Sequence, residues 1–157
     1  MIITIAHHRG GVGKTTLALN LAATLKPDII IDLDMHDTLT TLNQFRETPL
    51  PLVHCDSNNL LEVLNQEKLI LIDCGGDDGE IIQKAIALSD LVIVPVNDEI
   101  NELIGLAKFD RLLAELSGQI NAPINAFILP YRIHHATKQV QGLVDFAAQS
   151  QSFRKLE

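Results

Sequence analysis

Residues 8–16, which read HRGGVGKTT, decide how this chain of 157 residues folds. They follow an aliphatic segment at residues 2–6 and precede residues 17–25, where apolar side chains recur at helical spacing. A strand, a glycine-rich turn that ends in Gly-Lys-Thr and a helix together make a phosphate-binding loop. The alternative is a glycine turn that contains Lys-Thr by chance, but the flanking strand and helix favour a site for a nucleoside triphosphate.

The residue types in this loop suit phosphate binding. Gly10, Gly11 and Gly13 let the backbone turn tightly and point successive N–H groups at phosphate oxygens. The helix that begins near Lys14 adds the positive end of its dipole. We expect Lys14 to reach the β- and γ-phosphates and the Thr15 hydroxyl to bind Mg²⁺.

Aliphatic runs that alternate with helical patterns predict the rest of the fold. The runs lie at residues 2–6, 29–33, 69–73, 91–96 and 124–129, with a possible further one at 51–55. Helices are expected at residues 14–25, 39–45, 58–65, 78–88, 100–116 and 137–149. Near-continuous aliphatic strands are typical of buried parallel sheets, and strand–helix alternation implies right-handed crossovers. We expect a three-layer α/β fold, a doubly wound, mostly parallel sheet flanked by helices on both faces, in a single domain over residues 1–157.

Acidic residues end two of the predicted strands. Asp32 and Asp34 stand two apart at the end of the second strand, so their side chains are expected on one face. Asp73 follows four aliphatic residues, the Walker B pattern, from which it would reach Mg²⁺ through water. Because ligands bind at the carboxyl ends of the strands in such sheets, we expect these acids beside the loop. The alternative for the first pair is two acids that simply meet solvent at a strand end.

Composition bounds the class of protein. Apolar residues make up 46% of the chain and aromatic residues 4%, which fits an aliphatic α/β core. No apolar run is long enough to span a bilayer, and the N-terminus lacks the features of a signal peptide. Cys55 and Cys74 form no Cys-x-x-Cys pair and fit reduced thiols, so we expect a cytoplasmic protein.

The net charge of −8 is unevenly distributed. Residues 1–107 hold six basic and sixteen acidic side chains, whereas residues 108–157 hold six basic and four acidic ones. The C-terminal segment is therefore the candidate surface for DNA, with a solvated face of mixed charge as the alternative. The candidate DNA-binding residues are Arg132, Lys138, Arg154 and Lys155.

The order of these motifs resembles the ParA/MinD family of deviant Walker A P-loop ATPases, and small ParA-like partition proteins most of all. That family has Lys-Gly-Gly-x-Gly-Lys-Ser/Thr in its loop, and here Arg9 stands at the position of the signature lysine. The family's Asp-x-Asp switch resembles residues 32–34, and its Ala-Asp-x-Val-Ile-x-Pro strand resembles residues 89–95. The resemblance runs from Met1 to Lys138. Because family members usually continue with a further strand and helices, this chain is expected to be shortened at its C-terminus.

The resemblance also assigns roles to residues. Arg9 would reach across a nucleotide-sandwich dimer to the partner's phosphates, for which its planar fork is suited. Asp34 would orient the attacking water, and Tyr131 would stack on the base or, alternatively, pack at the domain edge. The implied catalytic residues are Lys14, Asp34 and Arg9, and the implied metal-binding residues are Thr15, Asp32 and Asp73. The implied nucleotide-binding residues are Arg9, Gly10, Gly11, Val12, Gly13, Lys14, Thr15, Thr16 and Tyr131.

The resemblance implies a slow, partner-stimulated ATP hydrolase that uses ATP, ADP and Mg²⁺. Its ATP-dependent homodimer would bind nonspecific DNA, and so the nucleoid, in plasmid or chromosome partition. A centromere-binding or other protein would be the stimulating partner. Two alternatives stay open. One is a MinD-like positioning ATPase at the membrane, although no stable membrane anchor is evident, and the other is an ATP-dependent biosynthetic enzyme on the same fold.

Overall fold

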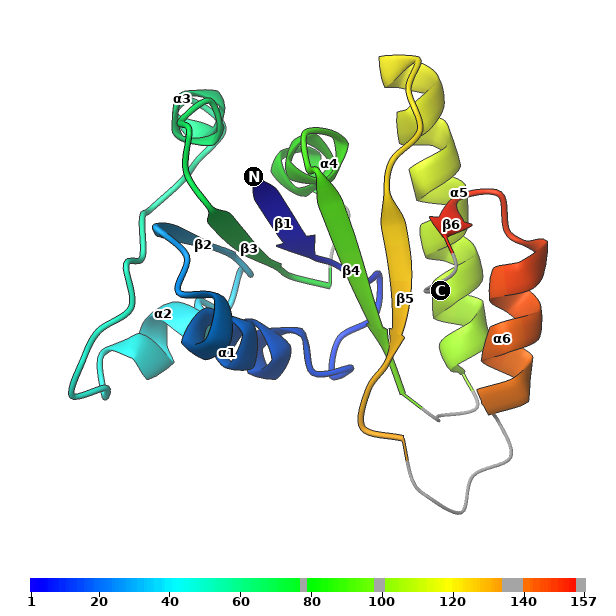
Figure 1. Cartoon of the computed structure of the whole chain (residues 1–157), viewed down its shortest axis with the longest axis horizontal. Coiled ribbons are helices and arrows are strands. Elements are labelled where there is room, and N and C mark those ends of the chain that lie inside the picture. The colour runs from blue at the N-terminus through cyan, green and yellow to red at the C-terminus, as the bar shows by residue number, and fades with distance from the viewer. Residues whose placement is uncertain (77–78, 98–100, 134–139, 155–157) are drawn as a thin grey trace.

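The strand that precedes the phosphate-binding loop lies in the middle of a parallel sheet. A computed structural model describes residues 1–76, 79–97, 101–133 and 140–154. Its six strands pair in parallel in the order β2-β3-β1-β4-β5-β6 (Figure 1). These are β1 (Ile2–Ile5), β2 (Ile29–Leu33), β3 (Ile70–Cys74), β4 (Leu91–Val96), β5 (Ala126–Pro130) and β6 (Phe153–Arg154).

Helices cover both faces of this sheet and confirm the three-layer α/β fold. Two helices, α1 (Lys14–Leu25) and α2 (Thr38–Asn43), pack on one face. The opposite face is covered by α3 (Leu60–Leu64), α4 (Glu80–Ala87), α5 (Glu102–Ile120) and α6 (Val140–Gln149) (Figure 1). Successive strand residues point to opposite faces, so Ile3 and Ile5 join the core under α1 while Ile70 and Ile72 join the core under the other helices.

Two segments differ from the sequence-based expectation. The possible strand at residues 51–55 is reduced to a single bridge between Ile30 and Leu52, and the Leu52 N–H donates to the Leu50 carbonyl instead of extending a ladder. The short strand β6 was not expected, because two residues carry no periodic signal. It pairs with β5 through Ala126 and Phe153, both of them buried.

The sheet places the loop and two of the acids at one edge. Asp73 is in register with Ile5 on β1 and with Asp32 on β2, so the two carboxylates stand on adjacent strands where those strands end. This is the edge from which the loop leaves β1 and enters α1. No helix in the part of the chain that the structure describes is long and apolar enough to cross a membrane.

Candidate nucleotide-binding site

The loop between β1 and α1 adopts a conformation that needs its glycines. Gly11 and Gly13 have φ angles of +80° and +95°, in the left-handed region that glycine enters without strain. Gly13 is the N-cap of α1 and makes no side-chain cap hydrogen bond, and its carbonyl accepts from the Leu17 N–H at 2.9 Å. The first N–H groups of α1 therefore face the pocket without a capping side chain, as an anion site requires.

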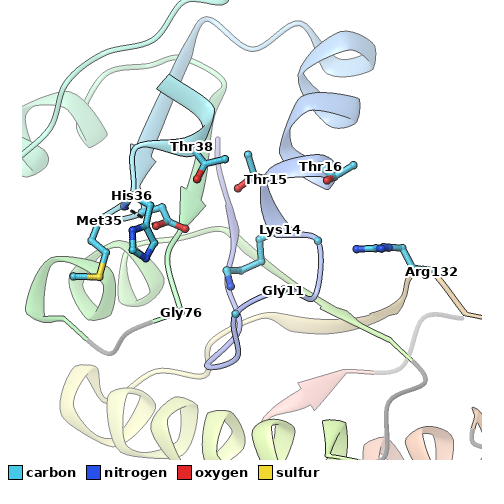
Figure 2. Close-up of a pocket in the computed structure, with 12 residues that line it drawn as sticks. Gly11, Lys14, Thr15, Thr16, Met35, His36, Thr38, Gly76 and Arg132 are labelled. Carbon is cyan, nitrogen blue, oxygen red and sulfur yellow. Dashed lines mark hydrogen bonds between the residues drawn. The ribbon is translucent and has the colours of Figure 1, made fainter. Parts of the chain in front are cut away.

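A pocket of about 590 Å³ opens over this loop. Figure 2 shows Lys14 and Thr15 in the middle of the site, with Met35 and His36 on one side and Arg132 on the other. The wall opposite the loop comes from the segment that joins β2 to α2. The residues that line the pocket are Gly10, Gly11, Gly13, Lys14, Thr15, Thr16, Asp34, Met35, His36, Thr38, Gly76 and Arg132.

Lys14 is held inside the loop. Its side chain is buried, and Nζ donates a hydrogen bond to the Arg9 carbonyl at 2.9 Å. Burial lowers the pKa of Lys14 from its usual value, while the nearby carboxylates of Asp73 and Asp34 act in the opposite direction. The ammonium is thus fixed under the loop and close to acidic groups, a position from which it can meet phosphate oxygens.

Asp73 is a buried carboxyl group that fits a cation. It is fully buried, and neither of its oxygens has a hydrogen-bond partner of good geometry. Burial raises its pKa to about 7, with a smaller contribution from the Asp32 charge, against the opposing effects of the Thr15 hydroxyl and of Lys14. An unsatisfied buried carboxylate next to a threonine hydroxyl is a donor pair that suits Mg²⁺ with water and phosphate oxygens as its other ligands.

No group of three or more His, Cys, Asp or Glu side chains in the described part of the chain is arranged to hold a metal ion. Mg²⁺ commonly keeps several waters and binds through one or two carboxylates together with substrate phosphates. Asp73 supplies one carboxylate and Thr15 one hydroxyl, which are enough protein ligands for a Mg²⁺ site of this kind.

The other two acids take part in the turn after β2. The Asp32 carboxylate accepts hydrogen bonds from the Thr40 N–H at 2.9 Å and the Thr40 hydroxyl at 3.0 Å, which ties β2 to α2. Asp34 lines the pocket, and its Oδ1 accepts from the His36 N–H at 2.9 Å. In this structure Asp32 therefore shapes the pocket wall that carries Asp34.

Arg9 points away from the pocket and pairs within its own chain. Its Nη1 donates to Glu102 Oε2 at 3.0 Å, at the start of α5. Glu102 Oε1 also lies 3.1 Å from His7 Nε2, without the alignment of a hydrogen bond. The Arg9 N–H in turn donates to His7 Nδ1 at 3.0 Å. The residue at the signature position is thus bound in cis to α5.

The segment after β5 packs against the loop. A Cβ placed on Gly13 would meet the Tyr131 ring at 2.9 Å and the Arg132 side chain at 3.3 Å. Tyr131 is half-buried against the core under α1 and is not among the residues that line the pocket, whereas Arg132 lines it. Of the other predicted residues, Thr16 lines the pocket and Val12 is fully buried, so Val12 can contribute only its backbone.

The structure describes only some of the predicted DNA-binding residues. Arg132 belongs to the pocket wall, beside Gly13. Lys138 and Lys155 lie outside the described residues, and for Arg154 only the backbone, in β6, is described.

Some residues of the site were not among the predicted site residues. Gly76 approaches the loop so closely that a Cβ there would lie 3.2 Å from the Gly10 nitrogen. Met35, His36 and Thr38 complete the pocket wall. Glu102 was also missed by the sequence analysis. Its spacing of three from Gly105 places an acidic residue and a residue without a side chain on the same face of the helix.

A glycine-rich loop between the central strand and the first helix of a parallel sheet, over a buried Walker B aspartate, defines a P-loop nucleotide-binding domain. Residues 1–68 match the family described as AAA domain. No curated protein matches the chain.

Solved structures share the fold over nearly the whole chain. A plasmid partition protein from Borrelia burgdorferi is 20% identical with a TM-score of 0.66, covering 97% of this chain and 86% of its own. McdA from Cyanothece is 17% identical with a TM-score of 0.74, covering 98% and 84%. Cobyrinic acid a,c-diamide synthase from Mycobacterium smegmatis, solved with ADP and magnesium, is 19% identical with a TM-score of 0.72, covering 96% and 82%. These likenesses confirm the expected fold, a parallel sheet flanked by helices as in P-loop proteins.

Proposed function

We propose that this chain is a single-domain ParA-like ATPase that binds Mg-ATP, pairs with a second copy around the nucleotide and acts in the partition of DNA. The observation that carries the proposal is the pocket in which the N-terminus of α1, buried Lys14 and buried Asp73 converge. The neighbours named as a plasmid partition protein and as McdA support this class of ATPase.

The residues divide the chemistry of hydrolysis between them. The loop N–H groups and Lys14 hold the β- and γ-phosphates and stabilise the charge that develops on them. Asp34, on the pocket wall, orients a water whose oxygen forms a bond to the γ-phosphorus as the bond to the β–γ bridging oxygen breaks, which releases ADP and phosphate. Thr15 and Asp73 would hold Mg²⁺, which would neutralise charge on the phosphate oxygens when bound.

The proposed dimer places two nucleotides between two chains, with Arg9 of each chain directed at the phosphates of the other. DNA binding would then belong to the dimer, and a centromere-binding or other protein would stimulate the slow hydrolytic step. Association with the nucleoid would follow from the DNA binding.

One neighbour supports a second candidate. Cobyrinic acid a,c-diamide synthase is named as a biosynthetic enzyme and aligns with 96% of this chain. A ligase of that kind would pass the γ-phosphoryl group to a small carboxylic acid instead of to water. Mass spectrometry of the products distinguishes the two, because an ATPase of the proposed type yields only ADP and phosphate.

The oligomeric state tests the proposal. Light scattering coupled to gel filtration should show a monomer with Mg-ADP and a dimer with Mg²⁺ and a nonhydrolysable ATP analogue. Arg9→Ala should bind nucleotide but stay monomeric, because the trans contact to phosphate is lost. A wild-type chain that binds the analogue and remains monomeric at every concentration would contradict the proposal.

A further inference from the structure

Arg132, two residues after the end of β5, has a backbone conformation that is unusual for its residue type. Its φ angle is +59°, in the left-handed region where a Cβ atom crowds the following carbonyl oxygen. Glycine enters this region without strain, and asparagine and aspartate enter it more readily than other residues. Backbone strain of this kind is concentrated at ligand-binding and active sites.

This conformation lays the Arg132 side chain across the phosphate-binding loop. A Cβ on Gly13 would lie 3.3 Å from Arg132 Cδ. The side chain lines the pocket of about 590 Å³, and Figure 2 shows it on the same side of Lys14 as Thr16, with His36 on the opposite side. Within the described part of the chain, no hydrogen bond or ion pair engages the guanidinium, so its planar face is open to a ligand.

The chemistry of the loop fixes which end of a nucleotide this side of the pocket receives. The loop lysine reaches the β- and γ-phosphates, while the loop N–H groups hold the α- and β-phosphates. An attacking water must stand beyond the γ-phosphorus, and Asp34, which would orient it, lies in the same wall as His36. The nucleoside therefore leaves the loop on the opposite side, past Thr16 and toward Arg132 (Figure 2).

Arg132 carries the planar group that can contact a base at that end. Tyr131 is half-buried against the core under α1 and does not line the pocket. Among the described residues that line it, the rings and guanidinium groups belong to His36 and Arg132, and His36 is on the far side. A guanidinium is planar, carries a delocalised charge and stacks on aromatic rings.

We propose that Arg132 positions the nucleoside by stacking its guanidinium on the base, and that the left-handed backbone at this residue aims it there. The proposal rests on the nucleotide binding of the proposed function and deepens it. It assigns Arg132 to the nucleotide and not to DNA. Because every base has a π face, stacking holds a base without reading its edge, so ADP and GDP should gain alike from this contact.

Arg132→Gly removes the side chain and relieves the backbone. Isothermal titration should show the Kd of Mg-ADP rising on the order of tenfold, as for the loss of one stacking contact, and the Kd of Mg-GDP rising as much. Tripolyphosphate carries phosphates without ribose or base, so its affinity should be unchanged. Urea unfolding should show no loss of stability, because glycine adopts this φ angle without strain.

Lys26→Gly is the matched control. Lys26 is exposed, has a φ angle of +50° and is the C-cap of α1, at the end of the helix away from the loop. The change removes the same charge from the same region of backbone space, at a position where glycine is favoured. It should leave the affinities for ADP and tripolyphosphate unchanged and cause no loss of stability.

Arg132→Lys separates the plane from the charge. Lysine keeps the positive charge but lacks the planar group, so ADP should still bind more weakly than to wild type, with tripolyphosphate unaffected. This variant decides the question if Arg132→Gly fails to fold.

The outcomes separate the inference from the function beneath it. ADP affinity equal to that of wild type in the Arg132 variants overturns the inference and leaves the proposed function standing. Equal weakening of ADP and tripolyphosphate shows a contact to phosphate and also overturns stacking on the base. Loss of affinity for duplex DNA with ADP affinity unchanged returns Arg132 to the DNA surface. Wild type that binds neither ADP nor tripolyphosphate removes both the inference and the proposed function.

Discussion

At the scale of single residues, the burial of the Asp73 carboxylate lowers the stability of the fold and places a ligand for a cation in the pocket. Burial without a hydrogen-bond partner of good geometry is what raises its pKa to about 7. A buried carboxylate is rare in protein interiors unless it is paired with another charge or coordinates a metal ion. The same burial that destabilises the ionised acid makes it a strong ligand for a cation.

The raised pKa predicts how stability depends on pH when Mg²⁺ is absent. Between the unfolded value of 3.8 and about 7, the folded state binds a proton that the unfolded state has lost, so stability falls as pH rises through this window. Asp73→Asn should remove this slope. At pH 8 in a chelating buffer it should raise the free energy of unfolding by about 2–4 kcal/mol.

Urea unfolding at pH 5 and pH 8 checks this prediction. The stabilisation by Asp73→Asn should shrink toward pH 5, and hydrolysis of Mg-ATP should be lost at either pH. An asparagine variant that is less stable than wild type at pH 8 would show that Asp73 has a partner in the folded protein.

At the scale of elements, the absence of a side chain at Gly105 determines how closely α5 approaches the loop. A Cβ on Gly105 would lie 3.1 Å from His7 Cε1 and 3.5 Å from Arg9 Cβ. The His7 ring cannot retreat, because it is fully buried and stacked on Phe109. Glycine at this position lets the helix come close enough for Glu102 to meet the loop.

Gly105→Ala should therefore destabilise the protein. Alanine gains about 0.5–1 kcal/mol of helix propensity, but overpacking a rigid site costs roughly 1–3 kcal/mol, which leaves a net loss on the order of 1 kcal/mol. Gly118→Ala on the same helix has open space around its Cβ and should stabilise by about 0.5–1 kcal/mol. Urea unfolding of the two variants measures both signs, and a stabilised Gly105→Ala would contradict the close approach.

At the scale of the whole molecule, charge decides how DNA can be bound. A chain with a net charge of −8 is repelled by DNA unless its basic groups gather on one surface. Pairing two chains doubles every local patch, which favours DNA binding by the dimer over the monomer.

We expect binding to nonspecific duplex DNA with Mg²⁺ and the ATP analogue, and none with ADP. Affinity should fall at least about tenfold between 50 and 200 mM salt, which corresponds to about two neutralised phosphates. Fluorescence anisotropy of a labelled duplex measures this. Retention that does not depend on the nucleotide would argue against partition.

The sequence predicts local features of this molecule well and distant contacts poorly. The bounds of α1, β2 and β4 match the expectation, because capping glycines and aliphatic runs act over a few residues. The pairing of Arg9 with Glu102 joins residues 93 positions apart, and neither residue differs in type from an ordinary surface charge. The hydrogen bond between Thr40 and Asp32 could not be predicted either. It depends on where α2 begins, and the periodicity of apolar residues does not fix that position.

The place of β1 in the sheet has a consequence for how the chain acquires its structure. In this sequence it precedes both of its neighbours, β3 and β4, which end at residues 74 and 96. While the chain is being synthesised, the aliphatic segment IITI therefore has no partner strand until residue 74, and one of its edges stays unpaired until residue 96, when about three-fifths of the 157 residues have been translated. Such distant parallel pairing is slow to form, so the nucleotide pocket is completed late, and newly made chains are exposed to aggregation for longer than a hairpin protein of this size.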